Sequence, residues 1–282
     1  MHDVTVASFN VKNLIAADQE YYKFQTYTPE EYAWKEDWLA DQLLALDADV
    51  IGFQEIFDEA PLQAVLDETS RRAIVLNEAA QPDQTKPYRK KAIFRRLESG
   101  GYAGASLAFA PNAADGGVPG ERRPGVAILS RLGFEGAPEI IQDLAEPLVI
   151  PFAPLRGLDA GDAGQFTLKR VSRPILKVRI KMGAHTVTVF NCHVKSKLGE
   201  FVTPPGADHP PEADLTEYDP LGRALGALRA ATRRMAEAWV LRRAIVAELE
   251  AGNPVIAMGD FNDGEHAVSS EIIAGERPFK NY

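Results

Sequence analysis

The sequence predicts an α/β fold, because short apolar runs typical of strands alternate with stretches of helical periodicity. Residues 4–10 (VTVASFN) and 49–55 (DVIGFQE) are apolar runs that each end in a polar residue. Between them, residues 30–46 carry apolar side chains at helical spacing, which gives a strand, helix, strand order. A chain of 282 residues, 45% of them hydrophobic, can bury a large core. We therefore expect one α/β domain over residues 1–282.

The second half of the chain continues this pattern. Further strands are predicted at residues 125–130, 174–181, 186–195 and 254–260, which are separated by turns rich in glycine and proline. A long amphipathic helix is predicted over residues 223–250, with arginines opposite an apolar stripe that contains Leu225, Leu228, Met235 and Trp239.

Two stretches have the composition of loops. Residues 99–124 are rich in glycine, alanine and proline, and residues 202–222 combine prolines with several acids. We expect both to be loops, the second of them a proline-rich insertion. No repeat of 20–50 residues and no domain linker is evident along the chain.

The composition excludes some classes of site and partner. Cys192 is the single cysteine, which excludes an internal disulfide and any multi-cysteine metal site. The formal net charge of −9 argues against a general polyanion-coating protein, because phosphate-rich partners need local positive surface. Two basic clusters are predicted to be either solvated surface or phosphate-binding surface: Arg89, Lys90, Lys91, Arg95 and Arg96, and then Arg229, Arg233, Arg234, Arg242 and Arg243 on the long helix.

Nothing in the sequence predicts a membrane span, since no run of 18 or more residues is apolar throughout. The chain begins in a strand-like segment, Val4 to Phe9, and not in a basic and then apolar leader. We therefore expect a cytoplasmic protein, or a secreted one if a signal peptide has been removed. The sequence carries no indication of oligomeric state.

Polar residues stand at or near the ends of four predicted strands, where α/β folds usually place their ligands. They are Asn10, Glu55, His193 and the run Gly259-Asp260-Phe261-Asn262. A Mg²⁺ ion takes oxygen ligands, often one or two protein carboxylates, and keeps its other positions for water and phosphate oxygens. Glu55 and Asp260 supply carboxylates of that kind.

Alternation along residues 186–195 separates the two residues that could suggest a cysteine nucleophile. Successive side chains of a strand face opposite ways, so Cys192 and His193 point to opposite sides of the sheet. A Cys192–His193 catalytic pair is therefore geometrically poor, and we expect Cys192 to be a small core residue. The predicted faces contain Asn191, His193 and Lys195 on one side and Phe190, Cys192 and Val194 on the other.

Five motifs, in this order and spacing, resemble those of the endonuclease/exonuclease/phosphatase (DNase I-like) superfamily, in particular its bacterial nuclease-type members. Each motif is common by itself, but all five in order across residues 5–262 are specific. The motifs are Ala7-Ser8-Phe9-Asn10-Val11, Ile51-Gly52-Phe53-Gln54-Glu55, Arg123-Pro124-Gly125-Val126-Ala127-Ile128-Leu129-Ser130-Arg131, Asn191-Cys192-His193-Val194-Lys195-Ser196 and Gly259-Asp260-Phe261-Asn262.

This resemblance implies a four-layer α/β/β/α sandwich of two packed mixed β-sheets with the site at one end. It implies that Glu55 binds Mg²⁺, with Mn²⁺ as an alternative, and that Asn10 helps to position metal and phosphate. Asp260 resembles the aspartate that orients or deprotonates the attacking water, and Asn262 the asparagine that holds Asp260 or a phosphate oxygen. His193 resembles the histidine that contacts the scissile phosphate, with protonation of the leaving group as a further role.

Other residues are weaker candidates, and each candidate has a structural alternative. Lys195, Arg123 and Asn191 are expected to contact the substrate, although solvated surface is an equal reading for Lys195 and Arg123. Asn10 and Asp260 could instead cap turns, Glu55 could be a surface acid and His193 a satisfied structural group. These alternatives are left to the structure.

The sequence departs from the family pattern at two places. Lys12 stands where many relatives carry an acid that could help to hold a second metal, so we expect a one-metal site. The family ends in a Ser-Asp-His element, yet no histidine follows His266, which is itself expected to be a surface residue. We therefore expect a C-terminally incomplete domain that is weakly active or inactive.

The predicted function is divalent-metal-dependent hydrolysis of phosphodiester bonds, of a nuclease-like kind, with a phosphoester substrate and nucleic acid as the candidate partner. An alternative is a phosphatase or phosphodiesterase that acts on a small or lipid-derived phosphoester. A second alternative is a catalytically degenerate protein that only binds a partner. Fold alone does not decide among them, because one fold supports many functions.

Overall fold

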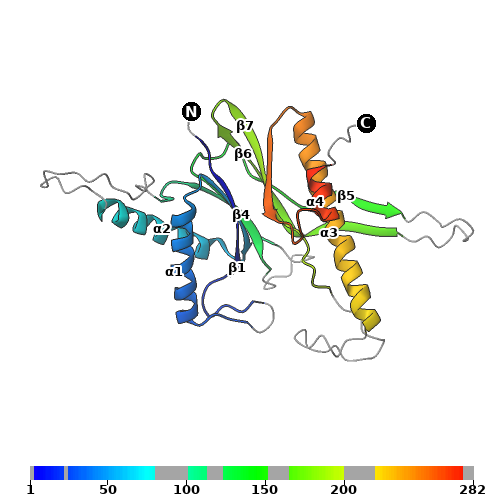
Figure 1. Cartoon of the computed structure of the whole chain (residues 1–282), viewed down its shortest axis with the longest axis horizontal. Helices are drawn as coiled ribbons and strands as arrows, with labels where there is room; N and C mark the ends of the chain where they lie inside the picture. The colour runs from blue at the N-terminus through cyan, green and yellow to red at the C-terminus, as the bar shows by residue number, and fades with distance from the viewer. Residues whose placement is uncertain are drawn as a thin grey trace, which may run out of the picture.

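Two β-sheets pack face to face in the computed structural model, and a pair of helices covers the outer side of each sheet (Figure 1). These four layers are the α/β/β/α sandwich that the resemblance implied. The structure describes residues 3–21, 25–79, 101–112, 123–151, 165–199 and 220–275. The cluster at residues 89–96 and most of the predicted insertion at residues 202–222 lie outside these ranges.

The first sheet comes from the N-terminal half of the chain and has the strand order β1-β2-β4-β3. Strands β1 and β2 are parallel and are connected by α1, whereas β4 runs antiparallel to both of its neighbours. The elements of this half are β1 (Val6–Leu14), α1 (Pro29–Leu46), β2 (Val50–Ile56), α2 (Glu59–Ala79), β3 (Ser106–Ala110) and β4 (Gly125–Ser130).

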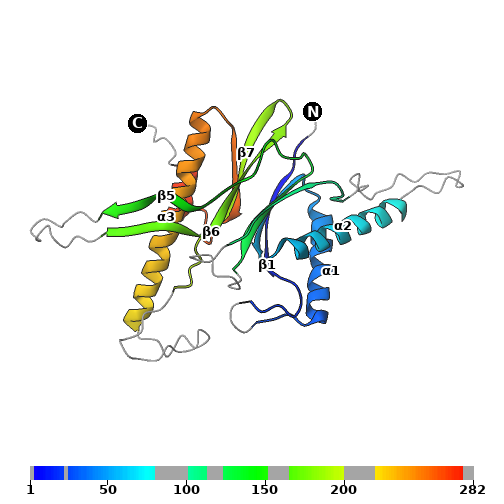
Figure 2. The same cartoon turned by 180° about the vertical axis from the view of Figure 1, so that it is seen from behind.

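The second sheet comes from the C-terminal half and has the order β5-β6-β7-β8. Strands β7 and β8 are parallel and are connected by the long helix α3, which lies on one side of this sheet (Figure 2). The C-terminal ends of both strands therefore lie at the same edge of the sheet. The elements of this half are β5 (Glu139–Pro151), β6 (Gln165–Met182), β7 (His185–His193), α3 (Pro220–Glu250), β8 (Val255–Asp260) and α4 (Val268–Ala274).

Apolar alternation fixes which face of each strand meets which layer. On β7, Phe190 and Cys192 pack in the core beneath α3, whereas Val187 and Val189 lie in the core between the two sheets. The predicted division of this strand into two faces is therefore confirmed, and Cys192 is a buried core residue. Within the described residues, no helix is both long and apolar enough to span a membrane.

The sequence prediction missed four elements, namely α2, α4, β3 and β5. Residues 99–124 were expected to be a loop, but Ser106–Ala110 forms β3, because its backbone completes a full ladder with β4. Helix α2 shows no clear apolar stripe, since Ile74, Val75 and Leu76 are consecutive and exposed in addition to its buried face. Pro220–Gly222, placed in the predicted insertion, is the first turn of α3.

The orientation of α3 differs most from its sequence pattern. In an amphipathic helix the apolar stripe packs on the core, yet Leu225, Leu228, Met235 and Trp239 are all exposed. The buried face instead carries five small residues, two charged ones and three larger aliphatic ones near its C-terminal end: Gly222, Gly226, Ala230, Arg234, Ala236, Glu237, Ala238, Val240, Leu241 and Ile245. The five arginines therefore do not share one solvated face, because Arg234 is buried.

We expect Gly259→Ala to destabilise the second sheet. Gly259 has φ +147, and a Cβ atom there would lie 2.0 Å from the carbonyl oxygen of Cys192 on β7. The backbone would have to move, so we expect the free energy of unfolding to fall by about 2–4 kcal/mol, as measured by urea denaturation. Gly264→Ala is the matched control, since a Cβ atom there meets nothing within 4 Å. Equal stability of the two variants would contradict this expectation.

Candidate active site

Polar side chains from both sheets converge at one end of the space between them. The amide nitrogen Nδ2 of Asn10 on β1 donates to Glu55 Oε1 on β2 (3.0 Å) and to Asp260 Oδ2 on β8 (2.9 Å). His193 at the end of β7 places its Nε2 atom 3.9 Å from the same Asp260 oxygen. Asn262 follows β8 directly and donates its backbone N–H to Asp260 Oδ1 (2.8 Å). The structure thus brings together five of the predicted site residues.

A β-bulge turns Glu55 toward this site. Gln54 pairs with Val126 and Ile56 with Gly125, so Glu55 is an extra residue without a partner on β4. Its φ is +66, in the left-handed region that side chains other than glycine rarely adopt. Regular alternation would have pointed Glu55 toward the helices, on the side of Phe53. The bulge therefore gives the site its carboxylate at the cost of local backbone strain.

A left-handed turn in β1 completes the surroundings of Glu55. Lys12 and Asn13 have φ of +53 and +59, and the backbone N–H of Asn13 donates to Glu55 Oε2 (3.0 Å). The backbone N–H of Lys12 donates to Asn10 Oδ1 (2.9 Å), and Lys35 Nζ on α1 donates to the Lys12 carbonyl. Both oxygens of Glu55 and the amide of Asn10 are thereby fixed. Burial, and next the charge of Lys12, lower the pKa of Lys35 to about 8.

Hydrogen bonds keep Asp260 ionised. Burial raises the pKa of Asp260, but the donors Asn10 and the Asn262 N–H, with the positive charge of Arg173, outweigh it and hold the pKa below its ordinary value. The Asn262 side chain donates to the carbonyl of Val194 (3.0 Å) and so joins the turn after β8 to the segment after β7. Asp260 is therefore an oriented carboxylate that can accept a proton or a hydrogen bond.

His193 is buried and uncharged near neutral pH. Its side chain is 3% exposed, and burial, followed by the nearby guanidinium of Arg173, lowers its pKa to about 3 against the opposing effect of Asp260. Its Nδ1 atom is buried and has no hydrogen-bond partner among the described residues. A neutral imidazole can donate one hydrogen bond, but a pKa of about 3 leaves almost no protonated form to act as a general acid near neutral pH.

Arg173 on β6 is a cation at the site that the sequence motifs missed. Its charge acts on both His193 and Asp260, and its Nη1 donates to the Val194 carbonyl (3.3 Å). The predicted strand began at residue 174, whereas β6 begins at Gln165. No motif included Arg173, so only the pairing of β6 with β7 reveals its place.

Asn191 does not lie where a substrate could contact it, contrary to expectation. It is fully buried, and its Nδ2 donates to the carbonyls of Phe53 (2.9 Å) and Ala127 (2.8 Å) in the opposite sheet. Its Oδ1 accepts from Gln54 Nε2 (2.7 Å). Asn191 thus satisfies backbone groups between the sheets and fixes their relative position next to the site, because buried polar groups must be paired.

The two basic residues predicted to contact substrate lie beside the site. Lys195 follows β7, and its Nζ donates to the carbonyl of Leu198 (2.6 Å) in its own loop. Arg123 is exposed two residues before β4, whose first residue, Gly125, pairs with Ile56 next to Glu55. His266 is exposed and lies apart from this set, beside Glu265, as expected.

Buried charged residues of α3 hold the two loops that carry the site. Glu237 accepts hydrogen bonds from the backbone N–H groups of Lys195 (2.7 Å) and Ser172 (2.7 Å). Arg234 donates to the carbonyl of Lys195 (3.4 Å) and to Asp263 Oδ2 (3.0 Å). The loop after β7 and the turn after β8 are therefore anchored to the same helix.

The donor chemistry of this site fits a hard divalent cation. Glu55 supplies carboxylate oxygens and Asn10 an adjacent amide, and Asp260 lies one hydrogen bond away from the same amide. Among the described residues, no group of three or more His, Cys, Asp or Glu side chains could hold a metal. Mg²⁺ is often bound through one or two protein carboxylates, with waters and phosphate oxygens as its other ligands. The small number of protein ligands here is therefore compatible with Mg²⁺ binding.

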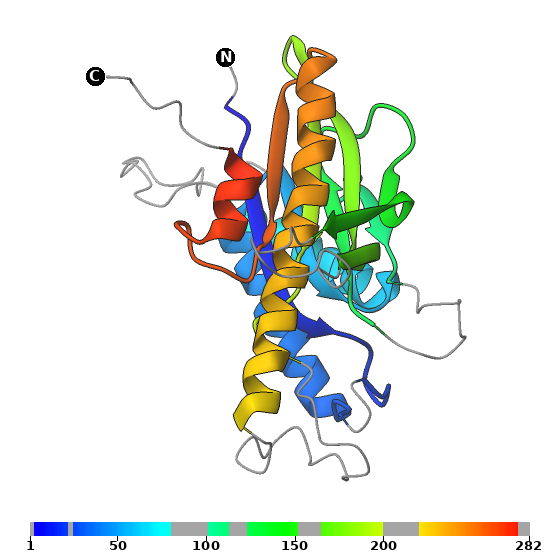
Figure 3. The same ribbon diagram turned by 90° about the vertical axis from the view of Figure 1, so that its right-hand side faces the viewer.

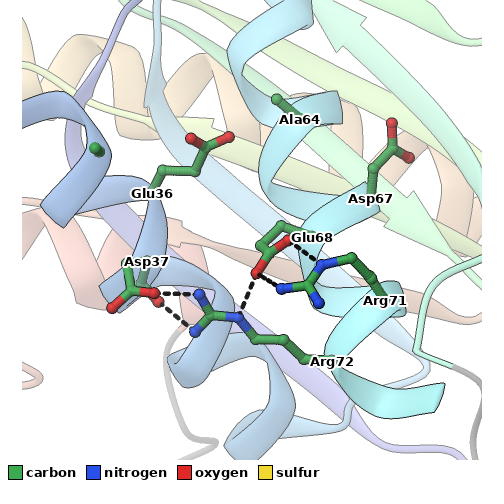
Figure 4. Close-up of a pocket in the computed structure, with 8 residues that line it drawn as sticks. Glu36, Asp37, Ala64, Asp67, Glu68, Arg71 and Arg72 are labelled. Carbon is green, nitrogen blue, oxygen red and sulfur yellow. Dashed lines mark hydrogen bonds and ion pairs between the residues drawn. The ribbon is translucent and has the colours of Figure 1, made fainter. Parts of the chain in front are cut away.

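A separate cleft of about 510 Å³ lies between α1 and α2 (Figure 4). Arg72 on α2 pairs there with Glu68 of its own helix and with Asp37 of α1 (Figure 4). It also pairs with Asp41 of α1 and so bridges the two helices. None of the five converging residues lines this cleft. It is a solvent-facing groove over an interhelical charge network, and it belongs to the packing of the first sheet's helices.

Comparison with known proteins places the whole described fold in one family. The model of the Endonuclease/Exonuclease/phosphatase family matches residues 7–274. Among solved structures, a β-hairpin deletion mutant of β-toxin from Staphylococcus aureus is 14% identical with a TM-score of 0.46, over 96% of this chain and 71% of that one. No match was found among curated protein sequences.

Two further solved structures are similar over the same extent. The human nocturnin catalytic domain with bound sulfate is 13% identical with a TM-score of 0.44, over 96% of this chain and 69% of that one. The mannosyl-6-phosphatase of Bacteroides thetaiotaomicron is 14% identical with a TM-score of 0.44, over 96% of this chain and 70% of that one.

We expect His193 to make the stability of the protein depend on pH. The folded pKa is about 3 and the ordinary value is 6.5, so below pH 6.5 the unfolded chain binds a proton that the folded chain excludes. The contribution is therefore complete above pH 6.5 and is lost as the pH falls toward 3. His193→Asn should lose less unfolding free energy than the wild type between about pH 7 and pH 5 in urea titrations. His266→Asn, an exposed control, should behave as the wild type does. The assignment would be contradicted if the unfolding free energy of His193→Asn changed with pH as steeply as that of the wild type and the control.

Proposed function

We propose that this chain, which belongs to the endonuclease/exonuclease/phosphatase family, hydrolyses phosphodiester bonds in a divalent-metal-dependent reaction of nuclease-like type. Members of the family are phosphoester hydrolases. One observation carries the proposal to this chain's own residues: Glu55 and Asp260, from different sheets, both accept a hydrogen bond from the Asn10 amide. Acids brought together across a fold in this way repel each other, and such arrangements are typical of sites that bind a cation and a phosphate.

Glu55 and Asn10 would hold a Mg²⁺ ion, with Mn²⁺ as the alternative, whose Lewis acidity stabilises negative charge on the phosphate oxygens. Both Glu55 oxygens already accept hydrogen bonds, from Asn10 and from the Asn13 N–H, so the carboxylate is oriented before any ligand arrives. Pre-oriented groups of this kind need little reorganisation during the reaction.

Asp260 is the proposed acceptor of the proton from the attacking water. Its low pKa keeps it ionised, and the Asn262 N–H and the Asn10 amide fix its two oxygens in direction. A general base must lie within hydrogen-bond reach of the proton it takes. Asn262, held to the Val194 carbonyl, positions Asp260 through its backbone N–H.

Arg173 and His193 are the proposed contacts for the reacting phosphate. Phosphoryl transfer spreads negative charge over the phosphate oxygens, and fixed donors and cations lower the barrier. Arg173 brings a permanent positive charge beside Asp260, and a neutral His193 offers one N–H donor. We assign His193 to hydrogen bonding and not to protonation of the leaving group, because its pKa of about 3 leaves it uncharged.

Hydrolysis of a small phosphoester is the second candidate, and the net charge of −9 favours it. A polynucleotide requires positive surface beyond the scissile phosphate. In the described residues Arg234 is buried and Arg233 is paired with Glu237, so the arginines of α3 offer less free positive surface than their number suggests.

We expect metal-dependent hydrolysis that Glu55→Gln nearly abolishes. With Mg²⁺ or Mn²⁺, the chain should cleave an artificial phosphodiester weakly but above the background seen with EDTA. Glu55→Gln should lower kcat/KM by roughly 100-fold or more, since the charge that holds the cation is lost. Glu250→Gln, an exposed acid on α3, is the matched control and should retain wild-type activity. Metal binding without cleavage of plasmid DNA, RNA or the artificial diester would instead favour a binding-only protein.

We expect salt to separate the two candidate substrates. Cleavage of duplex DNA should fall by roughly tenfold or more between about 50 and 200 mM salt, because binding to a polyanion is driven by counterion release. Hydrolysis of a small phosphoester should change far less over the same range. DNA cleavage that is weak and insensitive to salt, beside rapid turnover of a small phosphoester, would overturn the nuclease-like assignment.

A further inference from the structure

Helix α3 presents a second apolar face that the described residues leave uncovered. Figure 3 shows α3 along the outside of the molecule, with α4 beside only its C-terminal half. The exposed apolar residues of this face are between 36 and 80% exposed: Leu221, Leu225, Leu228, Met235 and Trp239. Helical periodicity places them opposite the buried face that packs on β6 and β8. Contiguous apolar surface of this kind marks interaction sites on soluble proteins.

The spacing of this exposed stripe is that of a helix–helix seam. Positions 221, 225, 228, 232, 235 and 239 are separated alternately by four and three residues, and all are apolar except Thr232. This 3.5-residue repeat keeps a narrow seam facing one partner helix over roughly 27 Å. The broader stripe of an ordinary amphipathic helix would also place large apolar residues at the flanking positions, which here carry Ala224, Arg229 and Ala231.

The exposed charged residues beside the seam on residues 220–247 of α3 are arginines. Arg229 and Arg243 flank it, are exposed, and make no ion pair or hydrogen bond with another described residue. Glu237 is the only acid between residues 220 and 247, and it is buried and bonded to backbone N–H groups. The face is therefore apolar along its centre and cationic along one edge.

We propose that this face of α3 binds an amphipathic helix of a partner protein that carries apolar residues at 3.5-residue spacing and Asp or Glu beside them. The apolar stripe supplies the buried contact, and Arg229 and Arg243 pair with acids at the partner's flanking positions, which select the partner in helix pairs. The proposal does not depend on hydrolysis, since none of these residues belongs to the candidate active site.

Two other occupants fit the observations less well. A second copy of the chain would set Arg229 and Arg243 of both copies along one seam, where residues 220–247 offer no accessible acid, and like charges across an interface oppose binding. An anionic lipid surface is better matched by a wide apolar face, and a net charge of −9 opposes its approach.

The test uses a fluorescein-labelled peptide of about four heptads with Leu at its a and d positions and Glu at its e and g positions. Its glutamates repel one another, so it resists pairing with itself. Anisotropy should show that it binds the intact chain, whereas a peptide with Lys at the e and g positions should bind at least tenfold more weakly.

Variants of exposed residues then locate the binding face without disturbing the fold. The double substitution Leu225→Glu with Leu228→Glu should weaken peptide binding at least tenfold, and Arg229→Glu with Arg243→Glu should weaken it about three- to tenfold. Leu132→Glu, an exposed leucine in the turn after β4, is the matched control and should bind as the wild type does. Circular dichroism should show unchanged helix content in all variants.

Four results of the peptide-binding and light-scattering measurements would overturn the proposal. They are no binding of the acidic peptide, equal binding of the acidic and basic peptides, binding that survives both double substitutions, and a dimer in light scattering that Leu225→Glu with Leu228→Glu abolishes. The last result would assign the face to a second copy. Sedimentation with phosphatidylserine vesicles, in the absence of peptide binding, would assign it to lipid and would also overturn the proposal.

Discussion

The Asn10 amide donates to carboxylates from both sheets, and the arrangement of the site depends on this double hydrogen bond. Two negative charges at such a short range repel strongly in a partly buried setting. Backbone N–H donors from Asn13 and Asn262 compensate, and so do the nearby cations of Lys35 and Arg173. The repulsion between the two carboxylates is therefore offset mostly by hydrogen bonds from backbone N–H groups and a side-chain amide, which do not titrate.

The hydrogen bonds of Asn10 to both carboxylates require that the two sheets keep one relative position. Asn191 joins them by donating to carbonyls of β2 and β4, and its Oδ1 atom accepts a hydrogen bond from Gln54 of β2. Gly52 leaves the necessary space, because a Cβ atom there would lie 2.9 Å from Asn191 Cγ. Buried polar groups between sheets are costly unless every donor and acceptor is paired, so they specify one relative position. Asn191 thus contributes to the site by position and not by contact with a ligand.

Much of this arrangement could be predicted from residues at strand ends, and the exceptions have physical causes. Asn10, His193 and Asp260 follow from regular alternation, and they lie together as their motifs indicated, although their roles stay predictions. Glu55 reaches the site through a bulge with positive φ, which no alternation rule contains. The orientation of α3 was not predictable from its apolar stripe, because small residues and the bonded Glu237 and Arg234 make the closer packing against the sheet. Composition does not report how closely two backbones approach.

The hydrogen bond from Asn10 to Asp260 joins residues that are 250 positions apart in the chain. Closing so long a loop is entropically costly, so this contact depends on the order of the chain between the two residues. Each sheet comes from one half of the chain, and neither half alone contains the paired acids. Chemical competence is thus a property of the docked halves, and a chain cut between them and separated would lack a reaction centre.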